Sequence, residues 1–443
     1  MLYKAGDAKD CSNYRTIALI SHTSKIMLYI ILERIKTKVE EELAEEQAGF
    51  RPGRGTGDML CAIQVMLEKI IDFHKEAFII FIDYSKAFDS VSHNELFKSL
   101  ITMGFPSHLV ALIQSLYTDQ TAKIRWNCSH TKPFRIGKGV RQGCILSPHL
   151  FSTYTEQIMR DTEMERCGIV VGGRKISNLR YADDTAICAN NQTLTEATTL
   201  INELNDAGER KGLKLNAKKT KYMHIGKEQH ASITIGNEEI ECVEHFKYLG
   251  SIKTDTADCS IDVNTRIGMA TKRMIDLNNI WKDKHIGKQL KIKLVKCLVW
   301  TVMTYGAEGW TLRKRDEKKI NSAEMWFYRR LLRVSWKEKR TDEAILAELQ
   351  VRRHLLESIR KRKLSFFGHI CRSKCTLMKD IIQGKLEGKR GRGRPRAAYL
   401  DNIKTWTRRN STEIYTMTQR REEWRKLVQK AVRAANVSRS DAG

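Results

Sequence analysis

Two adjacent carboxylates, Asp183 and Asp184, follow an aromatic residue and an alanine in the run Tyr181-Ala182-Asp183-Asp184. Short β-prone segments on either side, residues 176–180 and 185–189, predict a hairpin with the two aspartates at its tip. Neighbouring carboxylates repel each other and are costly to remove from water. A divalent cation such as Mg²⁺ relieves that repulsion and keeps coordination positions open for phosphate. An isolated Asp-Asp pair is more often an ordinary turn, so a metal site requires a third carboxylate.

Asp83 is the candidate for that third carboxylate. It follows the continuous apolar run 78–82, which predicts a strand buried on both faces. A carboxylate at the end of such a strand is held on a rigid element and opens onto a cleft. Three carboxylates from two neighbouring strands are what two-metal phosphoryl transfer requires, with the two cations roughly 3.5–4 Å apart.

Two glycine-containing loops could hold a nucleotide beside these carboxylates. Residues 47–55 combine glycines with Arg51 and Arg54, a composition suited to holding phosphates near backbone amides, although a plain basic loop is the alternative. In the second loop, Gly143 permits close approach of the backbone to a ligand, and the amide of Gln142 can both donate and accept. Ser147 followed by proline predicts the start of a helix there.

The elements that must position these residues can be inferred from periodicity. Apolar residues at helical spacing predict a helix from about Ser24, through Ile26, Ile30, Ile31 and Ile35. Further expected elements are helices at 59–70, 107–117 and 194–207, a basic hairpin at 122–136, and strands at 232–235 and 246–252. Residues 262–349 are predominantly helical by periodicity. Their tryptophans are interpreted as core residues, with base stacking as the alternative: Trp281, Trp300, Trp310, Trp326 and Trp336.

Charge dominates the composition. The 443 residues carry a net charge of +26, with a pI near 9.6, which argues for a polyanionic partner such as RNA or DNA. The length predicts two or three domains, and 41% hydrophobic residues allow a large core. No apolar run approaches the ~18–20 residues that span a bilayer, and no signal peptide is expected.

The cysteines are not spaced as a metal or disulfide framework. There are 11, an odd number, mostly in apolar contexts, which indicates reduced thiols in an intracellular protein. His369, Cys371 and Cys375 form a small cluster without a second ligand pair at finger spacing. A structural role is therefore preferred there over a zinc site.

Motifs in a fixed order resemble a reverse transcriptase. They are Asn13-Tyr14-Arg15, Gly49-Phe50-Arg51, Asp83 with Ala87-Phe88-Asp89, Gln142-Gly143 with Ser147-Pro148, Tyr181-Ala182-Asp183-Asp184, Gly212 with Lys219-Thr220, and Tyr248-Leu249-Gly250. The forms Ala87-Phe88-Asp89-Ser90 and Arg141-Gln142-Gly143-Cys144 are similar to non-LTR (LINE-type) retrotransposons. Runs near residues 304–308, 367–370 and 388–396 resemble the region that follows the polymerase in RTE/BovB-like elements.

The resemblance implies an α+β right-hand polymerase and an RNA-directed DNA polymerase activity in target-primed retrotransposition. Fingers and palm would occupy residues 1–255, a helical thumb or connector 256–350, and a basic nucleic-acid-binding region 351–443. The implied cofactor is two Mg²⁺ ions, with Mn²⁺ as an alternative. The implied partners are an RNA template, a DNA primer or target, and dNTPs, without a membrane. The expected location is the nucleus during integration and the cytoplasm during assembly with RNA.

The implied catalytic carboxylates and metal ligands are Asp83, Asp183 and Asp184, with the backbone carbonyl of Tyr84 as a further ligand. Phe88 would be a steric gate whose ring leaves no room for a ribose 2′-hydroxyl, although a core role is the alternative for this residue.

The remaining implied contacts involve the nucleotide and its leaving group. Arg51 and Arg15 would contact the triphosphate, and Gln142 and Gly143 would border the nascent base pair. Lys219 would help to protonate pyrophosphate, with Lys218 and Lys221 as neighbouring alternatives.

The C-terminal region adds a second nucleic-acid prediction. Residues 352–396 hold 15 Lys and Arg against three Asp and Glu, a net charge of +12. The candidate contacts are Arg390, Arg392, Arg394 and Arg396. They could bind phosphates non-specifically or enter an A·T minor groove as an AT-hook does.

The sequence begins at the first polymerase motif, so no endonuclease is expected in it. A catalytically silent or domesticated nucleic-acid-binding remnant is the alternative function.

Overall fold

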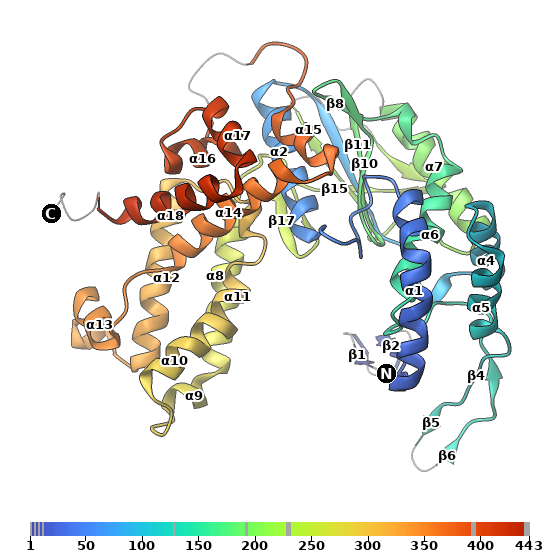
Figure 1. Cartoon of the computed structure of the whole chain (residues 1–443), viewed down its shortest axis with the longest axis horizontal. Helices are drawn as coiled ribbons and strands as arrows, with labels where there is room; N and C mark the ends of the chain where they lie inside the picture. Colours follow the sequence, from blue (N-terminus) through green and yellow to red (C-terminus); the bar gives the residue numbers. More distant parts are fainter. Residues whose placement is uncertain are drawn as a thin grey trace. The chain divides into compact units, whose positions relative to one another are not determined.

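The computed structural model describes residues 2–3, 6–7, 9–10, 13–126, 129–190, 194–226, 232–390 and 396–437. The chain forms two compact units. The first comprises residues 1–55, 77–170 and 175–243, and the second comprises 56–76, 171–174 and 244–443. Helices and a largely antiparallel sheet confirm the expected α+β class (Figure 1). The grouping differs from the three-part division proposed from sequence, because residues 351–443 fold together with 256–350.

A five-stranded sheet forms the centre of the first unit, in the order β10-β11-β3-β12-β15. Its middle strand, β3 (Ala77–Ile82), has all six residues buried, as the apolar run predicts. The other strands are β10 (Asn178–Tyr181), β11 (Asp184–Asn190), β12 (Lys221–Ile225) and β15 (Glu241–Cys242). All pairings are antiparallel except that of β12 with β15. Residues far apart in sequence therefore meet at one end of β3.

Helices cover this sheet and supply most of its core. They are α1 (His22–Glu42), α4 (His93–Thr102), α5 (Ser107–Tyr117), α6 (Ser147–Arg160) and α7 (Leu194–Arg210). Helix α6 contacts α1, α4 and α7 (Figure 1). The predicted helix starts are confirmed within a few residues: Ser21 caps α1 with its hydroxyl, and Ser147 begins α6 with proline next.

The buried face of α1 was predicted only in part. Ile31 and Ile35 are buried, but Ile26 and Ile30 remain more than half exposed. These two residues lie on the opposite side of the helix. Apolar residues on both sides make the periodicity ambiguous, and only the packing decides which side is buried.

The smaller elements of the first part of the chain are short. They are β1 (Leu2–Tyr3), β2 (Tyr14–Arg15), α3 (Ala87–Ser90), β4 (Thr121–Ala122), β5 (Arg125–Trp126), β6 (Ser129–His130), β7 (Phe134–Arg135), β8 (Ile169–Val171), β9 (Arg174–Ile176), β13 (Thr234–Ile235) and β14 (Glu238–Glu239). Pairing of β4 with β7 and of β5 with β6 confirms the hairpin expected at 122–136.

The second unit is mostly helical. It contains α2 (Thr56–Asp72), β16 (His245–Tyr248), β17 (Ser251–Thr254), α8 (Ser260–Asp276), α9 (Asn278–Lys282), α10 (Lys288–Leu294), α11 (Trp300–Met303), α12 (Lys314–Leu332), α13 (Asp342–Leu349), α14 (Leu355–Arg372), α15 (Thr376–Gln383), α16 (Tyr399–Thr407), α17 (Ser411–Gln419) and α18 (Arg421–Val437). The helical character predicted for 262–349 is confirmed. In the described part of the chain, no helix is both long and apolar enough to cross a bilayer.

Three of the five tryptophans interpreted as core residues are buried in the structure. Trp281, Trp300 and Trp310 are buried. Trp326 on α12 keeps 37% of its surface exposed, and the side chain of Trp336 lies outside the described residues. The alternative of base stacking therefore stays relevant for Trp326.

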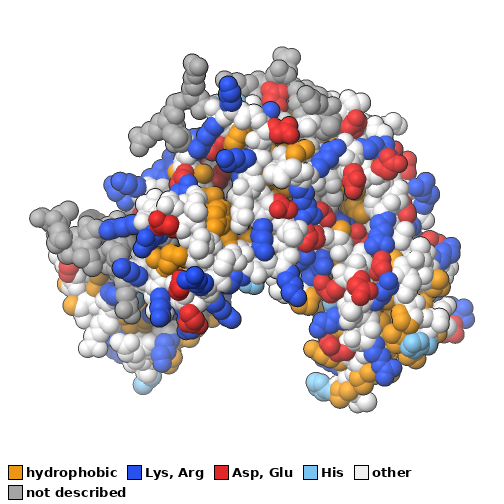
Figure 2. Space-filling model, turned by 45° about the horizontal axis from the view of Figure 1, so that its top comes forward, with side chains coloured by type: hydrophobic (Ala, Val, Ile, Leu, Met, Phe, Trp, Pro, Cys, Tyr) orange, Lys and Arg blue, Asp and Glu red, His pale blue; other side chains and the backbone are white. Residues whose placement is uncertain are grey.

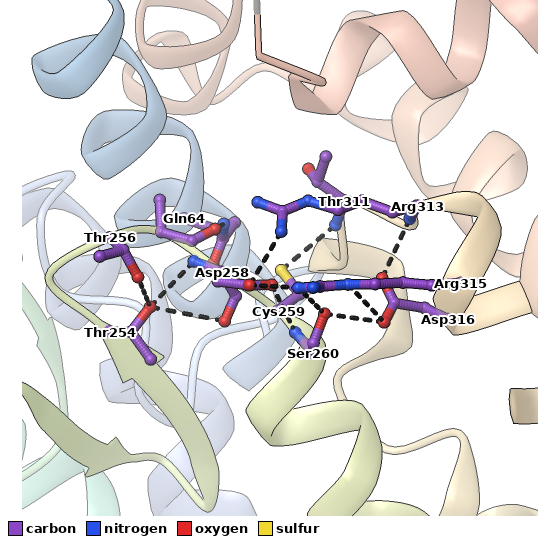
Figure 3. Close-up of polar contacts among 11 residues, drawn as sticks. Gln64, Thr254, Thr256, Asp258, Cys259, Ser260, Thr311, Arg313, Arg315 and Asp316 are labelled. Carbon is purple, nitrogen blue, oxygen red and sulfur yellow. Dashed lines mark hydrogen bonds and ion pairs between the residues drawn. The ribbon is translucent and has the colours of Figure 1, made fainter.

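A network of hydrogen bonds and ion pairs joins the turn before α8 to the start of α12 (Figure 3). The Asp258 carboxylate accepts from Arg313 Nη1 at 2.8 Å and from Arg315 Nη2 at 2.5 Å. Ser260 Oγ donates to Asp316 Oδ1 at 2.7 Å. Although burial by itself would raise the pKa of Asp258, the hydrogen bonds from Ser260 and the two guanidinium groups lower it below its usual range. The network fixes the relative position of these two helix starts.

A buried polar cluster attaches the C-terminal helices to α2. Glu68 accepts from Thr311 Oγ1 at 2.5 Å and from the Tyr399 backbone N–H at 2.7 Å. Lys363, fully buried, donates to the Trp310 carbonyl at 2.7 Å and lies 4.0 Å from the Tyr399 ring centroid. Burial raises the pKa of Glu68 and lowers that of Lys363 to about 8. The hydrogen-bond partners of Glu68 and Lys363 replace the hydration that these two side chains lose on burial.

Candidate active site

The hairpin that carries Asp183 and Asp184 has the geometry that the sequence predicts. Tyr181 pairs with Asp184, so Ala182 and Asp183 form a two-residue turn, and Ala182 has a positive φ of 59°. The next pair joins Thr185 of β11 to Ile82 of β3. Continued by one residue, this antiparallel register sets Asp184 opposite Asp83. The three carboxylates therefore lie at one corner of the sheet, at the end of a fully buried strand.

Mutual repulsion is evident in the electrostatics of this corner. Burial, followed by the charges of Asp183 and Asp83, raises the pKa of Asp184 to about 6. Within the described ranges, no three acidic, His or Cys side chains are already gathered around a point where they could hold a metal ion. The donor set nevertheless fits a hard divalent cation, because carboxylate oxygens suit Mg²⁺ and its charge would offset the repulsion.

A loop from the other edge of β3 brings one lysine to the carboxylates. The Asn216 backbone N–H donates to the Asp83 carbonyl at 2.8 Å, and the Lys219 N–H donates to the Asn216 carbonyl at 3.1 Å. Lys219 Nζ consequently lies 3.9 Å from Asp83 Oδ2, with 70% of its side chain exposed. Lys221 instead pairs with Glu241. Lys218 is an exposed residue of the same loop. Of these three lysines, Lys219 is thus the one that lies beside an aspartate of the site.

Aromatic rings line one side of this corner. Phe88, half-buried, stacks on Phe151 with ring centroids 4.3 Å apart and an interplanar angle of 14°. The Phe50 ring lies edge-on to Phe88 at 6.5 Å and tilted to Tyr181 at 6.2 Å. Phe88 is therefore held on one face by the core and is partly exposed to solvent. Tyr84 is different: its ring is buried, which raises the pKa of its phenol, and its backbone bridges Leu215.

Gln142 and Gly143 lie beside the short helix α3 and the segment before α1. Gln142 Nε2 donates to Asp89 Oδ1 at 3.0 Å, and the Gln142 carbonyl accepts from the Ala18 N–H at 2.7 Å. Gly143 has a φ of 98°, and a Cβ there would lie 3.0 Å from the Ala18 carbonyl oxygen. Glycine is thus required by both the backbone conformation and the close approach.

Gln47 is a site residue that sequence reasoning missed. Its side chain is fully buried, and its Oε1 accepts from the backbone N–H groups of Gly49 at 2.8 Å and Ala182 at 2.9 Å. Its Nε2 donates to the Ala182 carbonyl at 3.3 Å. Gly49 packs so closely on the hairpin that a Cβ would meet the Ala182 nitrogen at 2.3 Å. The amide therefore clamps the turn that carries Asp183, although no local pattern in the sequence marks it.

The expected contact of Arg51 with a triphosphate is corrected by the structure. Its guanidinium donates to the carbonyls of Ala44 at 2.6 Å and Gln47 at 3.1 Å, and to Glu40 Oε2 at 3.0 Å. The residue is only 9% exposed. These acceptors belong to the C-terminal end of α1 and the following turn, where a cation is favoured by unpaired carbonyls. Arg51 is a helix-capping residue here, and the side chain of Arg15 lies outside the described residues.

The C-terminal arginines and the cysteine cluster have simpler environments. Arg390 pairs with Asp72 at 2.6 Å, and Arg396 is exposed. Arg392 and Arg394 lie outside the described residues. Burial raises the pKa of the Cys371 thiol, and no metal-binding group of side chains includes it among the described residues. The structural role of this cluster stays a prediction.

Comparison with known proteins decides the family. Residues 4–252 match the model of the family described as reverse transcriptase (RNA-dependent DNA polymerase). The chain belongs to this family. The match confirms the right-hand polymerase fold expected of the reverse transcriptase region.

Relatives come from non-LTR elements. A Pol polyprotein from the type-1 retrotransposable element R2 of Popillia japonica is 30% identical over 222 residues, 50% of this chain and 31% of that protein. An RNA-directed DNA polymerase from mobile element jockey of Drosophila funebris is 24% identical over 353 residues, 76% of this chain and 37% of that protein. The chain thus spans about a third of each of these relatives. They confirm the resemblance to LINE-type reverse transcriptases that the sequence motifs indicate. A telomerase structure from Candida tropicalis aligns at 13% identity with a TM-score of 0.40, over 82% of this chain and 56% of that one.

Proposed function

We propose that this chain carries an RNA-directed DNA polymerase activity, which extends a DNA 3′ end on an RNA template. The observation that carries the proposal is the strand register that sets Asp184 opposite Asp83, in a chain of the reverse transcriptase family. The rigid strand β3 and the two-residue turn hold acidic side chains at one solvent-accessible corner. This arrangement suits a polymerase because phosphoryl transfer depends mainly on positioning and charge compensation.

Asp83, Asp183 and Asp184 would hold two Mg²⁺ ions, with Mn²⁺ as an alternative, and the Tyr84 carbonyl as a further ligand. When bound, these ions would lower the pKa of the 3′-hydroxyl and offset the charge on the phosphates. Lys219, 3.9 Å from Asp83, is available to donate a proton to the departing pyrophosphate.

The other site residues would select and align the nucleotide. Phe88 would exclude a 2′-hydroxyl with the edge of its ring, because stacking on Phe151 limits its movement. Gln142 and Gly143 would border the nascent base pair from the loop before α6. The positively charged surface supports binding of both strands: Figure 2 shows Lys and Arg side chains spread over the visible face.

At the level of the whole element, the proposed reaction is target-primed: the DNA 3′ end comes from a nicked chromosomal target. The names of the R2 and jockey relatives, a retrotransposable element and a mobile element, support a role in transposition. The proposed partners are therefore an RNA template, the target DNA and dNTPs, and the proposed location is the nucleus for integration and the cytoplasm for assembly with RNA. Residues 256–350 would act as the thumb and 351–443 as a basic nucleic-acid-binding region.

The test is incorporation of dTTP on poly(rA)/oligo(dT) by the purified chain with Mg²⁺. We expect incorporation by the wild type, and a loss of more than about 100-fold in Asp184→Asn. Asp206→Asn, an exposed aspartate on α7, is the matched control and should retain activity. A folded wild type that binds the RNA but incorporates nothing would refute the polymerase proposal and favour a nucleic-acid-binding remnant.

A further inference from the structure

A basic pocket in the second unit lies outside every motif of the polymerase. It has a volume of about 730 Å³ and is bordered by α12, by the segment that follows it and by Asn278 at the start of α9. Its lining includes five cationic side chains: Arg329, Arg330, Arg333, Lys339 and Arg340. An exposed indole, that of Trp326, belongs to the same lining. A volume of this size is within the range of small-ligand sites.

Positive charge in this pocket exceeds the available acidic partners. Arg329 Nη2 donates to Asp342 at 2.7 Å, but this carboxylate also pairs with Arg353 at 2.6 Å. Arg340 likewise shares Glu348 with Lys288. Two carboxylates are thus each divided between two cations. The pocket therefore has a capacity for anions that its own ion pairs do not use.

Three of the lining cations have no ion pair among the described residues: Arg330, Arg333 and Lys339. Cations near a helix C-terminus are often explained by the helix dipole, and that explanation suffices for Arg329 and Arg330 in the last turn of α12. Arg333 is the C-cap of α12, with a φ of 61°, whereas Lys339 lies further along the chain, with a φ of 45°. The dipole of α12 therefore favours a cation at Arg333 but does not account for Lys339.

The position of Trp326 adds a flat apolar surface to this charge. Trp326 and Arg330 are spaced i and i+4 on α12, so the indole and this guanidinium group share one face of the helix. Arg333, the C-cap of α12, lines the same pocket. The indole is 37% exposed, whereas the other described tryptophans of residues 262–349 are buried. An exposed indole beside guanidinium groups can stack a nucleobase while the cations bind the adjoining phosphate.

We propose that this pocket binds single-stranded nucleic acid, with a phosphate held by Arg333 and Lys339 and the neighbouring base stacked on Trp326. A single strand is favoured over a duplex because its base faces are accessible. A phosphate alone, or a phosphorylated peptide, would have no use for the indole. Binding here requires neither the carboxylates of the sheet nor dNTPs, so it goes beyond the proposed polymerase activity.

The experiment measures fluorescence anisotropy of labelled dT12, U12 and a 12-base-pair duplex with the full chain, without dNTPs. Trp326→Leu should weaken single-strand binding by about 5- to 150-fold, Trp326→Phe should retain most of it, and both should bind the duplex as the wild type does. The double variant Arg333→Glu/Lys339→Glu should weaken all single-strand binding and reduce the slope of log affinity against log salt by about 0.7 for each phosphate that the variant no longer binds. Comparing dT12 with U12 distinguishes DNA from RNA as the preferred strand.

A matched control separates this pocket from general charge effects. Lys36→Glu/Lys98→Glu makes the same change in net charge at exposed positions on α1 and α4, and should leave single-strand binding within about twofold. The proposal would be overturned if Trp326→Leu and Arg333→Glu/Lys339→Glu both bound single strands with wild-type affinity. An equal loss of duplex and single-strand affinity in Trp326→Leu would also overturn it. Repeating the assay in Asp184→Asn keeps the result independent of polymerase activity, and circular dichroism verifies folding.

Discussion

Replacing Gln47 by methionine should disable the hairpin that carries Asp183 without unfolding the chain. Methionine has nearly the same length and volume, so the packing around the site is kept. The change removes three hydrogen bonds, two to the Ala182 backbone and one from Gly49. Ala182 is only 5% exposed, so water can replace these bonds only if the turn moves.

The magnitude follows from the groups left without partners. Each buried backbone group that loses its hydrogen bond costs about 1–3 kcal/mol, so the two Ala182 groups together favour a rearranged turn by about 2–6 kcal/mol. The positive φ of Ala182 is a strain of about 1–2 kcal/mol. The hydrogen bonds of Gln47 hold the turn in this conformation, and a rearranged turn in the variant would release the strain. A displacement of about 1 Å at Asp183 is enough to reduce turnover about 100-fold.

The assay is steady-state dTTP incorporation on poly(rA)/oligo(dT), with kcat and KM determined separately. Since Gln47 is a positioning residue buried behind the turn, we expect kcat to fall about 100-fold with KM for dTTP nearly unchanged. Gln47→Glu should be intermediate, because a carboxylate can accept from both N–H groups but cannot donate to the Ala182 carbonyl. Gln114→Met, at an exposed position on α5, is the control. Wild-type kcat in Gln47→Met would refute the reasoning.

Three further predictions concern separate parts of the structure. Arg51→Met should lower the unfolding free energy by about 2–3 kcal/mol, measured by urea denaturation, because α1 loses its C-terminal cation; KM for dTTP should stay within twofold. Phe88→Val should admit rNTPs, measured as the ratio of rUTP to dTTP incorporation, because the ring edge that would exclude a 2′-hydroxyl is removed. Asp258→Asn should lower Tm at pH 7 by about 2–4 °C, because a partly buried ion pair of about 1 kcal/mol is lost. Since its pKa is lowered in the folded state, the stabilisation is present above the ordinary pKa near 3.8 and disappears as pH falls through the lower folded value.

Each of these has a clear opposite outcome. A tenfold rise in KM for dTTP in Arg51→Met, with stability unchanged, would restore the triphosphate contact. Unchanged discrimination in Phe88→Val would leave this residue a core aromatic that packs on Phe151. A Tm difference between Asp258→Asn and wild type that persists undiminished at pH 2 would show that the carboxylate charge contributes nothing.

Features that depend on neighbouring residues were predictable from sequence. The apolar run 78–82 predicted β3, and the two β-prone segments around Asp183 predicted the hairpin, because strand burial and turns follow local patterns. The order of motifs predicted the family that the comparisons then confirmed. The helix predicted from about Ser24 begins within a few residues of that position, and the helix start at Ser147 was predicted because proline is favoured in the first turn.

Other features arise from contacts between distant segments, and no local pattern encodes them. The clamp joins Gln47 to Ala182 across 135 residues, and Arg51 was assigned to phosphate because its carbonyl partners at the end of α1 are invisible in sequence. The exposure of Trp326 and the burial of Lys363 were equally undetermined until packing chose their neighbours.

By itself, the sequence determined where the buried strand and the hairpin lie and predicted a type of chemistry, since the carboxylates at positions 83, 183 and 184 belong to recognisable local patterns. Only the tertiary structure decided which polar side chains support that chemistry and which cap a helix or fill a core. The physical reason is that a side chain's role depends on the groups that replace its hydration, and these come from parts of the chain that meet only after folding.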